Sequence, residues 1–235
     1  SRCGLEVQDL SLQPLASSHA VLTEDEKELG VCMVDIGGGT TDIAVFTQGA
    51  IRHTAVLPVA GDQITNDIAM ALRTPTAEAE ELKIRHGVAM HQMADPEEMI
   101  EVPGVGDRPP RKLSRQALAD VIEPRVAELF ELVQAELRRS GYEELLSSGV
   151  VLTGGSSVMP GMAELGEEVF HMPVRVGAPQ YDGSLADVVC QPRYATAMGL
   201  VMEGAAQRRR GQQVREPRSV KQMFGRMKTW FERNF

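Results

Sequence analysis

The sequence has few aromatic residues, few cysteines and no long hydrophobic run. Only 4% of its 235 residues are aromatic, so we expect an aliphatic core that also uses the 12 methionines. The three cysteines are scattered and form no Cys-x-x-Cys pair, which argues against a disulfide scaffold and fits reduced cytoplasmic thiols. The five histidines lack the spacing of metal ligands. No apolar stretch approaches the roughly 18 residues that a membrane-spanning helix needs.

Charge is distributed unevenly along the chain. The formal net charge is −9, but from Gln207 onward nine basic residues stand against two acidic ones, so this tail carries +7 and the preceding residues carry −16. With 43% hydrophobic residues the chain can bury a core. An acidic body with a basic tail predicts that the tail meets an anionic surface.

Residues 34–42, which read VDIGGGTTD, are the most informative run. Apolar stretches at 30–34, 43–47 and 50–59 predict a strand, a glycine turn and two more strands. Residues without Cβ let successive backbone N–H groups approach a phosphate. A plain hairpin turn is the alternative, although it needs fewer glycines and no flanking acid. The residues expected to contact phosphate, or Mg²⁺ through water, are Asp35, Gly37, Gly38, Gly39 and Thr40.

A second run, residues 150–161 (VVLTGGSSVMPG), predicts a buried strand that ends in two glycines and is followed by a helix. Gly154 and Gly155, with Ser156 beside them, would let an adenine or ribose lie against the backbone. Taken alone, a strand followed by two glycines and a helix is ordinary in α/β proteins. In this order and at this separation, the two runs together are a strong signal of a nucleotide site.

The two runs resemble the second phosphate loop and the adenosine loop of the actin, hexokinase and heat-shock chaperone superfamily. Within it, the chain resembles the FtsA family of bacterial cell-division proteins along nearly its whole length. The resemblance implies an α/β fold of actin-like (ribonuclease H-like) type that binds ATP with Mg²⁺. Supporting stretches are 79–87 (AEELKIRHG), 102–106 (VPGVG), 108–111 (RPPR) and 121–125 (VIEPR).

The resemblance also implies roles for single residues in the phosphate half of the site. Residues 37–40 would hold the β- and γ-phosphates, and Asp35 would contact Mg²⁺ through a water molecule. Gly61 opens a helix whose N-terminus favours an anion. The next residue, Asp62, belongs to the same turn at the anion-binding end, but it could equally be no more than the N-cap of this helix.

In the adenosine half, Glu80 and Lys83 lie three residues apart on one helix face. They match the residues by which superfamily members hold the ribose and adenine, and an ordinary surface ion pair is the alternative. Chaperones of the superfamily stack an arginine on the base after the adenosine glycines, but this chain has Val158 there. Contact with the base is therefore expected to be built differently.

We expect an actin-like sheet subdomain with an inserted smaller α+β subdomain, plus a C-terminal amphipathic helix on a flexible tether. The sequence opens Ser-Arg-Cys, so we expect the C-terminal portion of a longer protein. The first phosphate loop and the residue that orients water would lie upstream, so this chain alone is not expected to hydrolyse ATP. The expected ranges are 1–28 (end of an upstream actin-like domain), 29–73 and 141–203 (sheet subdomain), 74–140 (insertion), 204–218 (tether) and 219–235 (amphipathic helix).

Hydrophobic periodicity and breaker residues predict the individual elements. Residues 1–28 are expected to contain a strand and a helix. Another helix, at 113–139, is expected to be interrupted or kinked near Pro124. The remaining predictions are helices at 61–72, 77–86 and 192–203, a helix ending at 170, and short strands at 99–102 and 173–176.

Residues 219–235 predict an amphipathic helix. Its apolar side chains fall on one face, bordered by Lys and Arg that can reach lipid headgroups. It holds the only Trp and three of the six Phe, which is typical of a helix lying in a membrane interface. A helix packed back on its own domain, or calmodulin-like binding, is the alternative. The residues expected to enter the membrane are Val220, Met223, Phe224, Met227, Trp230 and Phe231.

The resemblance implies an actin-like adaptor that self-associates into filaments and anchors FtsZ filaments to the cytoplasmic side of the inner membrane at the septum. We expect no enzyme, but a nucleotide switch with slow or absent turnover. The insertion is expected to bind the acidic C-terminal tail of FtsZ through Arg111 and Arg125; a solvated charged face is the alternative. Other division proteins are further expected partners, and nucleic acid is not. A chaperone-like or kinase-like ATPase of the same fold is the rival function.

Overall fold

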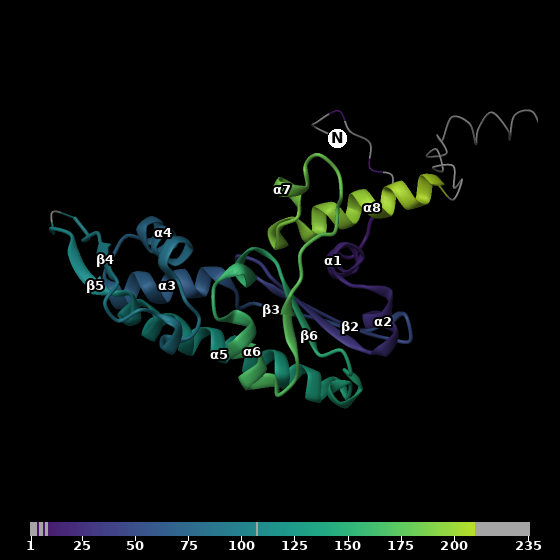
Figure 1. Cartoon of the computed structure of the whole chain (residues 1–235), viewed down its shortest axis with the longest axis horizontal. Helices are drawn as coiled ribbons and strands as arrows, with labels where there is room; N and C mark the ends of the chain where they lie inside the picture. The colour runs from purple at the N-terminus through teal and green to yellow at the C-terminus, as the bar shows by residue number, and fades with distance from the viewer. Residues whose placement is uncertain (1–3, 5–6, 8, 107, 210–235) are drawn as a thin grey trace, which may run out of the picture.

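The computed structural model describes residue 4, residue 7, residues 9–106 and residues 108–209 (Figure 1). Its centre is a five-stranded sheet in the order β3-β2-β1-β6-β7. β1 pairs antiparallel with β2 and parallel with β6, so the sheet joins an antiparallel meander to a parallel pair. The strands are β1 Val31–Ile36, β2 Thr41–Thr47, β3 Ala50–Leu57, β6 Val150–Thr153 and β7 Val174–Val176.

The central strand β1 is buried on both faces. Cys32, Val34 and Ile36 belong to one hydrophobic cluster, and Val31 and Met33 belong to another on the opposite face. A strand covered on both sides needs a continuous apolar run, which is what the sequence has here. β3, at the sheet edge, instead alternates half-buried and exposed residues.

Helices cover both faces of the sheet (Figure 1). α1 (Gln13–Val21) and α8 (Ala195–Arg209) pack against each other on one face. α5 (Arg115–Ser140) and α6 (Met162–Phe170) pack together on the other. The result is a three-layer α/β/α arrangement, in which each layer buries the apolar face of the next.

A smaller group of elements lies beyond one end of the sheet (Figure 1). It comprises α3 (Gly61–Leu72), α4 (Thr76–His86) and a two-stranded sheet of β4 (Met99–Val102) and β5 (Arg111–Ser114). α5 contacts both α3 and α6, so one long helix spans this group and the main sheet. One cluster of buried residues therefore runs through both parts.

Short elements complete the described chain. α2 (Glu24–Leu29) leads into β1 and contacts β2. The remaining short helical elements are η1 His91–Met93, η2 Glu143–Leu145, η3 Gly155–Val158, α7 Ala186–Val189 and η4 Pro192–Tyr194. Of these, η3 and η4 contribute residues to the site described below.

Most predicted elements are found, but the helix predicted at 113–139 needs correction. Residues 113–114 belong to β5, and Ser114 caps α5 by accepting a hydrogen bond from the Ala117 N–H. α5 then continues through Pro124, so an interruption there is wrong, while the alternative of a kink stays a prediction. Proline removes one helical hydrogen bond, but buried residues on both sides of it, including Ile122 and Val126, hold the helix in the core.

The ends of the chain also differ from expectation. Residues 13–29 form two helices, and no strand occurs among the described residues of 1–28. α1 packs on this chain's own sheet because Ala20 and Val21 share a cluster with Met33. α8 extends to Arg209, so residues 204–209 of the predicted tether are helical. The rest of the tether and the predicted helix at 219–235 lie outside the described residues.

None of the helices in the described ranges is long and apolar enough to cross a membrane.

Glu26 fastens α2 to β7, the other edge strand. Its carboxylate accepts hydrogen bonds from Arg175 at 2.7 and 2.8 Å and closes a capping box with Thr23. Burial raises the pKa of this carboxyl, but the bonds from Arg175 and Thr23 outweigh burial, so the pKa is lowered overall. Glu26→Gln should therefore lower the free energy of unfolding by about 1–2 kcal/mol at pH 7.

The sign of the pKa shift fixes the pH dependence of this effect. A lowered folded-state pKa stabilises the protein above the unfolded-state value of about 4.3, and the stabilisation is lost as pH falls through the folded pKa. The difference between Glu26→Gln and the unaltered protein in urea unfolding should thus stay constant from pH 7 to about 5 and shrink as pH is lowered below about 4.3. Glu28→Gln, on the exposed part of the same helix, is the control. A difference independent of pH would contradict the assignment.

Candidate nucleotide-binding site

A pocket of about 630 Å³ opens where the carboxyl ends of β1 and β6 meet. Because the two strands are parallel neighbours, the loops that follow them lie side by side at one edge of the sheet. The first loop contributes Gly37 and Gly38 to the pocket wall, and the second contributes Gly155 and Ser156. The structure therefore brings together the two runs singled out in the sequence.

Hydrogen bonds lock the phosphate loop to its neighbours. The Gly37 carbonyl accepts from the Gly61 N–H at 3.1 Å and from Ser156 Oγ at 2.9 Å, and the Gly38 carbonyl accepts from the Asp62 N–H at 2.8 Å. A Cβ on Gly61 would lie 2.5 Å from Ser156 Oγ, so the close approach requires glycine. The phosphate loop, the N-terminus of α3 and the adenosine loop thus fix one another.

Asp62 is a pocket residue and not a helix cap. The N-cap of α3 is Ala60, whose N–H donates to Gln63 Oε1 at 2.9 Å. The Asp62 side chain lines the pocket beside the phosphate loop, since a Cβ on Gly38 would lie 3.2 Å from Asp62 Oδ1. The sequence left this residue open between the two roles, and the geometry assigns it to the pocket.

Lys83 is buried, and its ammonium group is bound within the protein. Its Nζ lies 2.7 Å from Glu80 Oε2, 2.8 Å from Thr65 Oγ1 and 3.0 Å from the Gly61 carbonyl oxygen. The Thr65 hydroxyl also hydrogen-bonds to Glu80. Both Glu80 and Lys83 line the pocket, so they are not an ordinary surface ion pair. They tie α4 to the start of α3, with Thr65 as a partner that the sequence did not indicate.

Two carboxylates lie next to each other at the base of the phosphate loop. Asp35, at the end of β1, is 5% exposed and is the register partner of Asp42 on β2. Burial raises the pKa of Asp35, against the hydrogen bond that it accepts from Ser17. Burial and then the charge of Asp35 raise the pKa of Asp42. The sequence interpretation gave Asp42 no role, although it ends the same glycine run.

The remaining predicted residues lie beside the pocket rather than in its wall. Gly39 and Thr40 are exposed on the turn. Gly154 is buried with φ +88°, and a Cβ there would lie 2.4 Å from the Ile36 carbonyl oxygen and 2.5 Å from Asp35 Oδ1. Glycine is therefore required at 154 by packing against β1, and the contact of Gly154 with a base stays a prediction.

Arg193 is a pocket residue that no sequence pattern marks. η4 brings it opposite the adenosine loop, where its Cβ would lie 3.7 Å from a Cβ on Gly155. Its guanidinium carbon stands 4.9 Å from the centre of the Tyr194 ring. Val158 lines the same pocket. Arg193 is thus a basic residue of the pocket that comes from a different segment than the two glycine loops.

The residues present fit an adenine nucleotide with Mg²⁺. The pocket volume falls within the roughly 300–1,000 Å³ usual for small-molecule sites. Glycine backbone can approach phosphate oxygens, and Asp35 and Asp42 offer carboxylate oxygens to metal-bound water. Within the described ranges no three side chains form a metal-ligating group. A metal held here would take most of its ligands from phosphate and water, as Mg²⁺ commonly does.

Solved structures of low sequence identity share this fold. MreB5 of Spiroplasma citri bound to ADP has a TM-score of 0.68 and 18% identity, covering 88% of this chain and 63% of that one. The MamK double helical filament has a TM-score of 0.61 and 17% identity, covering 82% of this chain and 58% of that one. The expected actin-like α/β fold is confirmed.

Sequence comparisons identify the family. The family model described as cell division protein FtsA matches residues 32–199. Cell division protein FtsA of Pseudomonas aeruginosa is 60% identical and that of Escherichia coli K12 is 48% identical, each across the whole chain. The chain spans 58% of the length of both relatives. We conclude that the chain belongs to the FtsA family of actin-like cell-division proteins.

Proposed function

We propose that this protein is an ATP-binding adaptor that assembles into actin-like filaments and attaches FtsZ filaments to the cytoplasmic face of the inner membrane. The observation that carries the proposal is the pocket walled by both glycine loops, with Lys83 and Arg193 as its basic residues. Family membership favours this adaptor over a chaperone or a sugar kinase. The nucleotide acts as a switch on filament state, with turnover slow or absent. Self-association is supported by the likeness to the MamK filament.

Membrane attachment is assigned to residues 219–235 on their sequence pattern. A single short interfacial helix binds lipid weakly, so stable attachment depends on many copies in one filament. ATP, by favouring filaments, is therefore expected to increase the share of protein bound to membranes. The positions that carry the apolar face are those predicted above, and Trp230 and Phe231 are its two largest side chains.

Trp230→Glu with Phe231→Glu should abolish binding of the full-length protein to vesicles containing phosphatidylglycerol. Two carboxylates would enter the apolar face, and each charge is costly in the membrane interior and repelled by the anionic headgroups. Co-sedimentation with and without ATP measures the effect. Gln222→Glu with Thr229→Glu adds the same charge on the polar face and should retain most of the binding. Equal binding by both double variants would refute the interfacial helix.

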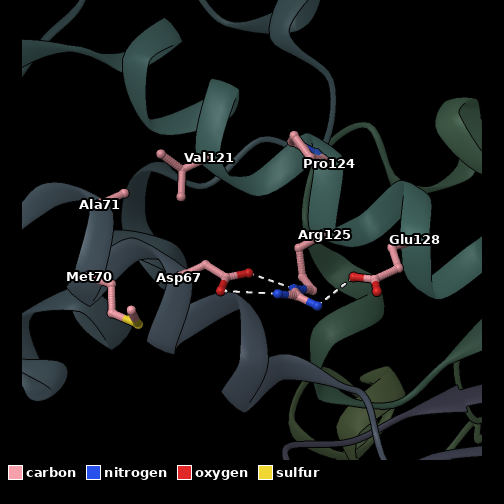
Figure 2. Close-up of a pocket in the computed structure, with 7 residues that line it drawn as sticks. All are labelled: Asp67, Met70, Ala71, Val121, Pro124, Arg125 and Glu128. Carbon is pink, nitrogen blue, oxygen red and sulfur yellow. Dashed lines mark hydrogen bonds and ion pairs between the residues drawn. The ribbon is translucent and has the colours of Figure 1, made fainter.

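FtsZ binding is assigned to the groove between α3 and α5 shown in Figure 2, which has a volume of about 310 Å³. Met70, Ala71, Val121 and Pro124 give it an apolar floor and wall. Figure 2 shows Arg125 projecting across it. The apolar side chains of a tail peptide would pack on this floor, and Arg125 is the basic group of the groove with which an acidic residue of the peptide would pair.

The charges of the groove correct the expected basic cluster. Arg125 is bound by Asp67 at 2.5 and 3.2 Å and by Glu128 at 2.5 Å, so two carboxylates already surround its guanidinium. Arg111 instead donates to the carbonyl of Leu72 and shares no partner with Arg125. An acidic peptide must therefore displace a resident carboxylate from Arg125 to pair with it.

Arg125→Glu should weaken binding of a labelled FtsZ tail peptide at least about tenfold, whereas Glu128→Gln should strengthen it two- to fivefold because a competing carboxylate is removed. Fluorescence anisotropy at low salt measures both changes. Arg85→Glu reverses a charge in an exposed ion pair on α4 and is the control. If Arg125→Glu matches Arg85→Glu, Arg125 has no part in tail binding.

A further inference from the structure

A chain of hydrogen bonds links the phosphate loop to the helices on the other side of the sheet. Ser17 Oγ on α1 donates to Asp35 Oδ2 at 2.8 Å, and Ser17 Oγ lies 2.9 Å from Thr196 Oγ1 in the first turn of α8. Because the single Ser17 proton is used on Asp35, Thr196 is the donor to Ser17. The chain therefore runs from Thr196 through Ser17 to Asp35, and one residue later β1 ends and the phosphate loop begins.

The two helices in this chain are held at close distance. A Cβ on Gly199 of α8 would lie 1.8 Å from the Ala16 carbonyl oxygen of α1, so the backbones touch. Ser17 follows Ala16 directly and is 0% exposed. A change in the position of Ser17 must therefore move α1 relative to α8, since no space separates them.

Asp35 is equally confined on its other side. Its Oδ1 is only 2.5 Å from where a Cβ on Gly154 would be, so the adenosine loop closes over it. Oδ2 accepts the hydrogen bond from Ser17, so the orientation of the carboxylate is restrained from both sides. Movement of this carboxylate is thus transmitted either to the adenosine loop or to the α1–α8 pair.

We propose that Ser17 and Thr196 are positioning residues for the magnesium–nucleotide site, and that the Thr196–Ser17–Asp35 chain couples occupation of that site to the packing of α8 on α1. The inference rests on the proposed ATP binding. α8 is the last helix described before the basic C-terminal segment. Movement of α8 on α1 would therefore transmit the nucleotide state towards that segment. The hydrogen-bonded serine contributes by orientation and not by contact with the nucleotide.

The test compares two adjacent buried serines of α1 in the full-length protein. Ser17→Ala removes the link to Asp35, whereas Ser18→Ala removes a hydroxyl that only bonds the Leu15 carbonyl within the helix. ATP affinity is measured with Mg²⁺ and with EDTA. Ser17→Ala should reduce the gain in affinity due to Mg²⁺ about tenfold and leave the metal-free affinity within twofold, and Ser18→Ala should change neither. Thr196→Val, at a half-buried position, should act in the same direction, and Thr196→Ser should restore the unaltered behaviour.

Hydrogen–deuterium exchange supplies a second readout of the same variants. In the unaltered protein, MgATP should slow exchange of the amides of residues 195–209, and Ser17→Ala should remove that difference while Ser18→Ala keeps it. If the Ser17→Ala and Thr196→Val proteins retain the full Mg²⁺ gain and the exchange difference, the coupling is refuted while ATP binding stands. If the unaltered protein binds no ATP, the proposed function fails and the coupling fails with it.

Discussion

Gly38→Asp should lower the ATP affinity of the full-length protein at least about 100-fold. Gly38 lines the pocket on the phosphate loop, and its missing Cβ would lie 3.2 Å from Asp62 Oδ1. An aspartate there sets a second carboxylate beside Asp62, where phosphate oxygens are expected. Repulsion and bulk then act together, and the repulsion is greatest at low salt because ions screen it.

An isosteric variant separates the effect of charge repulsion from the effect of bulk. Gly38→Asn has the same shape without the charge and should retain more affinity than Gly38→Asp, by about tenfold at low ionic strength. Titration of a fluorescent ATP analogue measures both, with circular dichroism to confirm folding. Unchanged affinity in Gly38→Asp would mean that the loop is an ordinary hairpin turn.

Gly199→Ala should lower the free energy of unfolding by about 3 kcal/mol, the upper part of the range for overpacking. Alanine favours a helix over glycine by about 1 kcal/mol, yet its Cβ would lie 1.8 Å from the Ala16 carbonyl oxygen and 2.4 Å from the carbonyl carbon. Both are backbone atoms, so no rotamer change relieves the contact. α1 and α8 must separate, and the buried face that they share with the sheet is disturbed.

Gly204→Ala is the matched control in the same helix. Nothing lies within 4 Å of a Cβ at Gly204, which is exposed, so helix propensity alone acts and stability should rise slightly. Urea unfolding of both variants measures the contrast. Equal effects at 199 and 204 would show that α1 and α8 do not pack as closely as described.

The parts that sequence predicted well depend on short-range regularities. The continuous apolar runs of β1 and β2, the glycine run between them and the helix at 61–72 follow from patterns within a few neighbouring residues. Pro124 is the instructive failure. Its local preference predicts a break, but the flanking positions of α5 are buried in the core, and packing outweighs one lost hydrogen bond.

The sequence by itself determined that two glycine loops follow apolar strands in the order of an actin-like site, because backbone access to an anion requires residues without Cβ. Only the tertiary structure decided which other side chains join them. Asp42, Thr65, Arg193 and Ser17 belong to separate elements that meet through strand pairing and helix packing. Helix packing also places Asp67 beside Arg125, from which it is far in sequence, and the ion pair neutralises the charge of Arg125. Charge pairing across such distances depends on the folded positions of two helices, and no local pattern records it.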